Sequence, residues 1–233
     1  MLSAQSPAAG SREALEKLCQ VYWYPIYAFV RHQGHNPDDA RDLTQGFFLH
    51  LFKHEALTRV DPLKGKFRSF LIASLQNYLL DQVDSAQRLK RGRNLEIVPL
   101  DTESAENHYD VGTMDFLTAE TLFDARWAMT LLDEVLRQLR EEYTSQGKTS
   151  IFEVLKPFLD PINGQVQLSY EQAAGALQVT VGSVKTLIHR LRRRYAVLLR
   201  EEVLRTVYDP SDVDEEIHSL CEALIATEGR LGP

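Results

Sequence analysis

The sequence predicts an all-α protein built from two small helical domains joined by a linker. Gly and Pro are scarce, at 12 and 9 of 233 residues, which favours helices over a turn-rich β protein. Apolar residues recur at three- and four-residue steps over long stretches, and no alternating strand pattern of useful length is present. An acidic, polar stretch without clear period then divides the helical signal into two parts.

These patterns give the expected boundaries. We expect an N-terminal domain at 11–93, a linker at 94–120, a C-terminal domain at 121–203 and an acidic helical tail at 204–233. The apolar fraction of 44% is enough for each domain to bury a core.

Composition also limits where the protein works. The sequence contains no apolar run long enough for a membrane span, and its first residues lack the pattern of a secretion signal. Cys19 and Cys221 lie far apart, without metal-ligand spacing, which favours reduced thiols over a disulfide. We therefore expect a cytoplasmic protein.

In the N-terminal half, "HNPDDARDLTQGFFLHLF" carries a strong helix start. Asn36 is the predicted N-cap, Pro37 takes the first helical position, and Asp38 and Asp39 lie in the first turn. Periodic apolar residues predict one helix before this start and another over "GKFRSFLIASLQNYLLDQV".

In the C-terminal half, "SYEQAAGALQVTVGSVKTLIHRLRRRY" predicts two helices joined by a tight turn. Ser169 followed by Gln172 forms a capping box, and Thr180 is placed to cap the second helix. The small residues Ala173 and Ala174 allow the two helices to approach closely. This is a helix-turn-helix layout, whose second helix enters the DNA major groove.

The second helix has an apolar face and an opposite face suited to DNA. Between Lys185 and Arg200 there are six Lys and Arg residues and no acid, although the chain has a net charge of -7. DNA binding requires a local positive surface and not a positive total. The alternative is a solvated basic face in an ordinary bundle. The candidate duplex-binding residues are Ser183, Lys185, Thr186, His189, Arg190, Arg192 and Arg193.

Here the sequence resembles bacterial RNA polymerase sigma factors of the compact extracytoplasmic-function (ECF) type. The two helices of the predicted helix-turn-helix resemble the C-terminal DNA-binding domain of these factors. In the N-terminal half, "DARDLTQGFFLHLF" resembles the helix that binds the polymerase clamp. The stretch "FRSFLIASLQNYLLD" resembles the helix before the loop that reads the opened promoter. The resemblance implies a factor without catalysis of its own. It would bind core RNA polymerase and promoter DNA, recognise a minus-thirty-five element and melt a minus-ten element.

The resemblance assigns the region 64–93 to the opened strand, and its residues suit that role. It holds seven basic and two acidic side chains, with aromatic residues among them, and capture of a separated strand needs cations along the backbone. The candidates are Lys64, Lys66, Arg68, Asn77, Arg88, Lys90, Arg91 and Arg93.

The resemblance also assigns polymerase binding to one flank of the second helix, with the candidates Asp39, Asp42, Gln45 and Phe48. Arg41 and Gly46 depart from the family pattern and reduce negative charge there. One hypothesis is that phosphorylation of Thr44 or Thr58 restores it, which would make a regulatory kinase a partner beside an anti-sigma factor. Leu187 is a further departure, at a position where the family often has Arg.

The acidic tail is unusual for this type of factor. It has apolar residues at helical spacing beside a dense acidic face, with nine acidic and two basic residues over 201–233. It would fold back on the basic helix, dock on another surface, or remain a helix with a solvated acidic side.

Other functions find less support. A helix-turn-helix regulator that binds duplex operator DNA without polymerase is the main alternative, and it would not need the basic 64–93 region. The spacing of His50 and His54 suits a metal, but no third ligand is evident, so no metal or cofactor is expected. No catalytic constellation is present either, and an enzyme is the weakest alternative.

Overall fold

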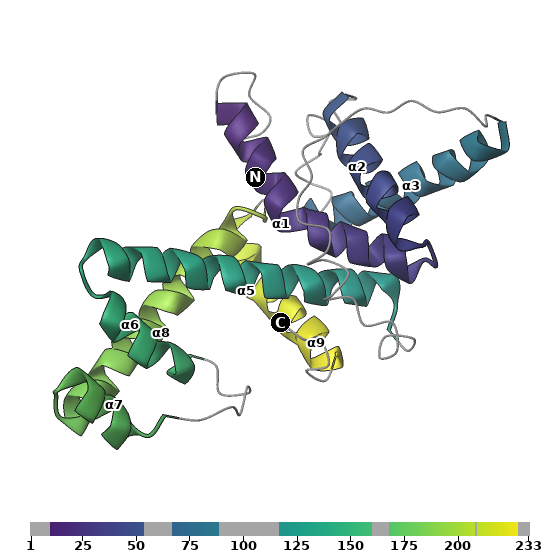
Figure 1. Ribbon diagram of the computed structural model, residues 1–233. Coiled ribbons are helices and arrows are strands. Elements are labelled where there is room, and N and C mark those ends of the chain that lie inside the picture. The colour runs from purple at the N-terminus through teal and green to yellow at the C-terminus, as the bar shows by residue number, and fades with distance from the viewer. Residues whose placement is uncertain (1–9, 54–66, 89–116, 160–167, 208, 228–233) are drawn as a thin grey trace. The chain divides into compact units, whose positions relative to one another are not determined.

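The computed structural model describes residues 10–53, 67–88, 117–159, 168–207 and 209–227 (Figure 1). Within these ranges the regular structure is helical throughout, without strands, which confirms the predicted all-α class. None of the helices in these ranges is long and apolar enough to cross a lipid bilayer.

The chain forms two compact units. Unit 1 contains residues 1–130 together with 203–233, and unit 2 contains residues 131–202. Two helices contribute to both units: α5 (Ala119–Ser145) and α8 (Val181–Leu204). This division differs from the expected boundaries, because the segment expected as a separate tail belongs to the N-terminal unit.

Unit 1 contains α1 (Gly10–His32), α2 (Pro37–Lys53), α3 (Phe67–Arg88), η6 (Pro210–Asp212), α9 (Val213–Ala226) and the first part of α5. The predicted start of α2 is confirmed, since the Asn36 Oδ1 accepts a hydrogen bond from the backbone N–H of Asp39 at 2.8 Å. This cap satisfies one of the free N–H groups of the first turn.

The core of unit 1 joins helices that are far apart in sequence. The ring of Tyr22 in α1 lies 5.6 Å from that of Phe67 in α3 and 5.9 Å from that of Trp127 in α5, between centroids. Ala28 of α1 and Ala223 of α9 share a buried cluster with residues of α5. The C-terminal helix is therefore part of this core.

A close approach between α2 and α3 explains one glycine. A Cβ built on Gly46 would lie 2.2 Å from the Tyr78 hydroxyl oxygen, a distance that non-bonded atoms do not tolerate. Tyr78 is itself buried and its ring lies 5.7 Å from that of Phe47. Gly46, noted in the sequence as a departure from the family pattern, is thus required by packing.

Unit 2 contains the rest of α5, α6 (Thr149–Leu155), η5 (Lys156–Phe158), α7 (Tyr170–Leu177) and α8 as far as Glu202. The buried residues of its hydrophobic core cluster come from every one of these α-helices: Val135, Leu139, Phe152, Leu155, Ala173, Ala174, Val184, Ile188, Leu191 and Leu198.

The turn between α7 and α8 has the predicted caps. Ser169 Oγ accepts from the Gln172 N–H at 3.1 Å, and the Gln172 side chain accepts from the Ser169 N–H at 2.8 Å, which confirms the capping box. Thr180 Oγ1 accepts from the Ser183 N–H and so caps α8. The turn passes through Gln178 at φ 54°, a left-handed conformation that glycine usually adopts.

Candidate nucleic-acid interface

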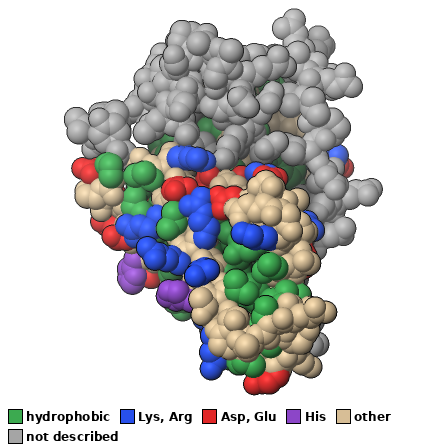
Figure 2. All heavy atoms as spheres, turned by 90° about the vertical axis from the view of Figure 1, so that its left-hand side faces the viewer, with side chains coloured by type: hydrophobic (Ala, Val, Ile, Leu, Met, Phe, Trp, Pro, Cys, Tyr) green, Lys and Arg blue, Asp and Glu red, His purple; other side chains and the backbone are tan. Residues whose placement is uncertain are grey.

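The face of α8 that was predicted to bind duplex DNA lies in solvent. Its apolar stripe, Val184, Ile188, Leu191 and Leu198, is buried in the core of unit 2. The other side of the helix is exposed at every candidate position: Ser183, Lys185, Thr186, His189, Arg190, Arg192 and Arg193. Figure 2 looks onto the side of the molecule where α6, α7 and α8 lie at the left of Figure 1, and Lys and Arg side chains gather on part of that face.

These candidates differ in what else they contact. Thr186 donates to the Gly182 carbonyl, Lys185 lies over the ring of Tyr170, and Arg192 donates twice to the Phe158 carbonyl. His189, Arg190 and Arg193 have no ion-pair partner among the described residues. Among the described residues no carboxylate balances the charge of Lys185, Arg190, Arg192 or Arg193, and Lys185 and Arg192 are in addition held by contacts within unit 2.

The neighbouring cation Arg194 is committed to the protein. It makes a two-pronged ion pair with Glu142 of α5, with Nε at 2.8 Å from Oε2. The hydrogen bonds from Arg194 lower the pKa of Glu142 below its ordinary value. Arg194 thus ties α8 to α5, and it also lies 3.8 Å from Glu201 of α8.

Leu187, where the family often has Arg, is partly buried and packs against the core of unit 2. The departure from the family pattern therefore places an apolar contact with the core where the family often has a charge.

Most candidates for the opened strand fall outside the described residues. Lys64, Lys66, Lys90, Arg91 and Arg93 lie outside them, and Arg88 ends α3 with its side chain outside them. Asn77 lies on α3 and is exposed.

Arg68 differs from its expected role, because it is only 5% exposed. Its Nε donates to the Glu216 Oε1 at 2.6 Å and its Nη2 to the Ser219 Oγ at 2.8 Å, both on α9, and it also pairs with Asp124 of α5. Burial alone would lower the pKa of Arg68, but the bonds to Glu216 and Asp124 raise it above its ordinary value. Its charge is balanced inside unit 1.

The contact between Arg68 and Glu216 also shows where the acidic tail packs. Glu216 of α9 is buried against Arg68, whereas Asp214, Glu215 and Glu222 are exposed. From the sequence, the tail was expected to fold back on the basic helix, to dock on another surface, or to remain a solvated helix. The structure has α9 docked on a surface other than the basic helix, and that surface belongs to unit 1. The exposed acids form the solvated side of the helix.

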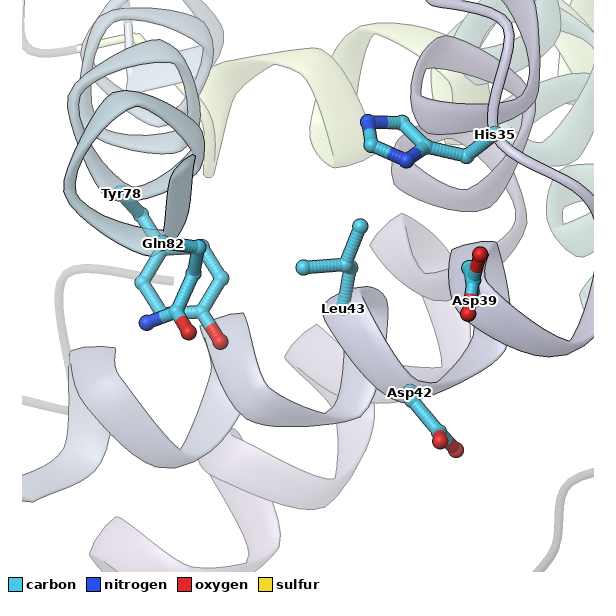
Figure 3. A pocket seen from close by; sticks show the side chains of 6 residues that line it. All are labelled: His35, Asp39, Asp42, Leu43, Tyr78 and Gln82. Atoms are coloured by element: carbon cyan, nitrogen blue, oxygen red, sulfur yellow. The ribbon is translucent and has the colours of Figure 1, made fainter. Parts of the chain in front are cut away.

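Two of the polymerase candidates on α2, Asp39 and Asp42, border a cavity of about 300 Å³. His35, Asp39, Asp42, Leu43, Tyr78 and Gln82 line it, and Figure 3 shows Leu43 between His35 on one side and Tyr78 with Gln82 on the other. Asp42 points away from its centre (Figure 3).

These candidates are not equally available. Asp39 and Asp42 are both exposed, and the Asp39 carboxylate also accepts a hydrogen bond from the Asn36 side chain at 2.7 Å as part of the cap. Gln45 is half-buried, and Phe48 is 3% exposed in the aromatic core of unit 1. Asp39, Asp42 and Gln45 are therefore accessible, and Phe48 is not.

Two further observations bear on the charge of this flank. Arg41 pairs with Asp38 across one turn of α2. Thr44 is fully buried and its hydroxyl donates to the Ala40 carbonyl, so this hydroxyl is not accessible to a kinase in the described arrangement. Thr58 lies outside the described residues.

Comparison with known proteins identifies the class of one region. Residues 22–89 match the family model of sigma-70 region 2. This match supports a sigma-70 family factor with a role in promoter recognition, and the matched family binds core RNA polymerase and promoter DNA. No curated protein and no solved structure matches the chain.

Two features of the site were missed from the sequence. One is the Glu216 partner of Arg68, which is 148 residues away. The other is the contact of Lys185 with Tyr170, 15 positions earlier on another helix. For the Glu216 contact the sequence held a signal, because Glu216 lies in a dense acidic stretch with apolar residues at helical spacing. No sequence pattern marks the contact of Lys185 with Tyr170.

Proposed function

We propose that the protein is a sigma factor of the ECF type that directs core RNA polymerase to specific promoters. In this proposal α2 binds the polymerase, α8 reads a duplex minus-thirty-five element, and the 64–93 region captures the opened minus-ten strand. The observation that carries the proposal is the presence of two features in one chain: the sigma-70 region 2 match over 22–89, and an exposed basic face on a second unit.

The geometry of α8 supports duplex reading. The cap at Thr180 leaves short side chains, Ser183 and Thr186, at the start of the helix, where the backbone approaches bases closely. Arg190 follows them on the exposed side, with the length to reach a base edge or a phosphate.

For the polymerase, the exposed Asp42 and the half-buried Gln45 support a polar contact on α2. Arg41 neutralises Asp38 beside them, which lowers the negative potential of this flank. Arg41→Glu should therefore raise the affinity for a positively charged polymerase surface, and an unchanged affinity would count against this assignment.

The test is run-off transcription by bacterial core RNA polymerase on a pool of genomic promoter fragments, with and without the purified full chain. A sigma factor should give new, discrete start sites and co-elute with the polymerase in gel filtration. Tight binding of the chain alone to a duplex, with no co-elution and no change of start sites, would favour the polymerase-independent regulator.

A further inference from the structure

An aromatic pair lies beside the candidate DNA-binding helix. The rings of Phe158 in η5 and Tyr170 in α7 stack with centroids 5.4 Å apart and planes 8° from parallel. The Nζ of Lys185 in α8 lies 5.6 Å from the centroid of the Tyr170 ring. This distance is within the range of a cation–π interaction.

Both rings are fixed in place by polar contacts. The capping box between Ser169 and Gln172 sets the first turn of α7, where Tyr170 is the first residue. Arg192 of α8 holds Phe158, because the Nε and Nη2 of Arg192 donate hydrogen bonds to the Phe158 carbonyl at 3.1 and 2.8 Å. The pair is therefore tied to α8 at one end and to the start of α7 at the other.

The contact with Lys185 lies at the surface. Tyr170 is 40% exposed and Lys185 is exposed, so a ligand on this face reaches both. A lysine side chain has four flexible methylene groups, and restricting them opposes binding. A lysine already held over an aromatic ring has lost part of that freedom before the ligand arrives.

We propose that Tyr170 is a positioning residue for duplex recognition: its ring holds the Lys185 ammonium in place for DNA. Arg192, one of the duplex-binding candidates from the sequence, has the separate role of holding Phe158 against Tyr170. The inference rests on the proposed function, and it adds two residues, Tyr170 and Phe158, to the determinants of promoter binding.

The test measures the affinity of the holoenzyme, full chain with core polymerase, for a promoter duplex found in the run-off pool. Tyr170→Phe keeps the ring and should leave the affinity within about twofold. Tyr170→Leu removes the ring and should weaken binding by about two- to fivefold, the size of an exposed cation–π contact. Lys185→Met should weaken binding at least as much.

The double variant separates positioning from a merely structural effect. If Tyr170 acts through Lys185, Tyr170→Leu should have no further effect in the Lys185→Met background. A loss of the same size in both backgrounds would show that the ring only stabilises α7, and would overturn the inference. Tyr143→Leu is the matched control, because Tyr143 packs on Phe152 in the same unit and its effect should not depend on Lys185.

The outcomes also distinguish the two proposals. If the wild-type holoenzyme initiates at discrete promoters and Tyr170→Leu binds as tightly as wild type, only the positioning role fails. If the wild-type chain does not redirect the polymerase at all, the sigma-factor proposal fails and the positioning role fails with it.

Discussion

In unit 1, Arg68 is 5% exposed and binds two carboxylates, whereas in unit 2, Arg190 and Arg193 are exposed and have no ion-pair partner among the described residues. From the sequence, these cations had the same expected role, contact with DNA. The difference shows that positive charge marks a nucleic-acid surface only where the fold leaves it unbalanced. In unit 1 the balancing acid comes from α9, at the other end of the chain.

The largest expected effect concerns the buried charge. Arg68→Met leaves Glu216 and Asp124 in the core without their cation, and should destabilise unit 1 by about 3–5 kcal/mol. Both tryptophans of the chain, Trp23 and Trp127, belong to unit 1, so urea unfolding followed by tryptophan fluorescence measures this unit.

The matched control is Arg190→Met, which removes an exposed cation from unit 2 and should change the stability of unit 1 by less than about 0.5 kcal/mol. The double variant Arg68→Met with Glu216→Leu should recover part of the loss. An unchanged unfolding midpoint for Arg68→Met would show that the buried ion pair does not form in solution.

The next effect concerns the exposed charge. Arg190→Ala should weaken binding of the holoenzyme to its promoter duplex by about 1–3 kcal/mol, or roughly 5- to 150-fold, without loss of stability. Fluorescence anisotropy with labelled promoter DNA measures the affinity. Arg137→Ala is the control, because Arg137 is an exposed cation of unit 2 that already pairs with Glu134 and Glu141. Equal losses for the two variants would argue against a specific face on α8.

A smaller effect compares glycines in the two units. Gly46→Ala brings a methyl group against the Tyr78 hydroxyl, and this clash costs about 1–3 kcal/mol, more than the roughly 1 kcal/mol that alanine gains over glycine in a helix. Tyr78→Phe removes the hydroxyl, and in that background Gly46→Ala should become stabilising. Urea unfolding of the wild type, the two single variants and the double variant gives the sign of each change in stability.

Gly175 of α7 is the counterpart in unit 2, since nothing lies within 4 Å of a Cβ at that position. Gly175→Ala should therefore stabilise unit 2 by up to about 1 kcal/mol, as measured by far-UV circular dichroism. If Gly46→Ala stabilises unit 1 in the wild-type background, Tyr78 does not pack against α2 as described.

The smallest effect lies in the turn before α8. Gln178 has a left-handed conformation at φ 54°, so Gln178→Gly should relieve strain and stabilise unit 2 by roughly 0.5–1 kcal/mol. Thermal unfolding at 222 nm measures it. Gln172→Gly, within the capping box at a helical position, should have the opposite sign. A destabilising Gln178→Gly would mean that the turn adopts another conformation.

Local signals in the sequence predicted local structure well. The cap at Asn36, the capping box at Ser169 and the cap at Thr180 were each predicted from residues at or next to the helix start, and each is confirmed. The exposed face of α8 was predicted equally well, because the period of its apolar residues fixes which side is buried. The sequence offered no comparable signal for Gly46, whose reason is a tyrosine on another helix.

By itself, the sequence determined the helical class, the helix starts and the two sides of α8, because neighbours within one or two turns decide these features. Only the tertiary structure decided that Arg68 is buried, that Phe48 belongs to the core and that α9 belongs to unit 1. The physical reason is that the exposure of a side chain and the electric field around it depend on residues that folding brings near. For Arg68 these residues come from α5 and α9.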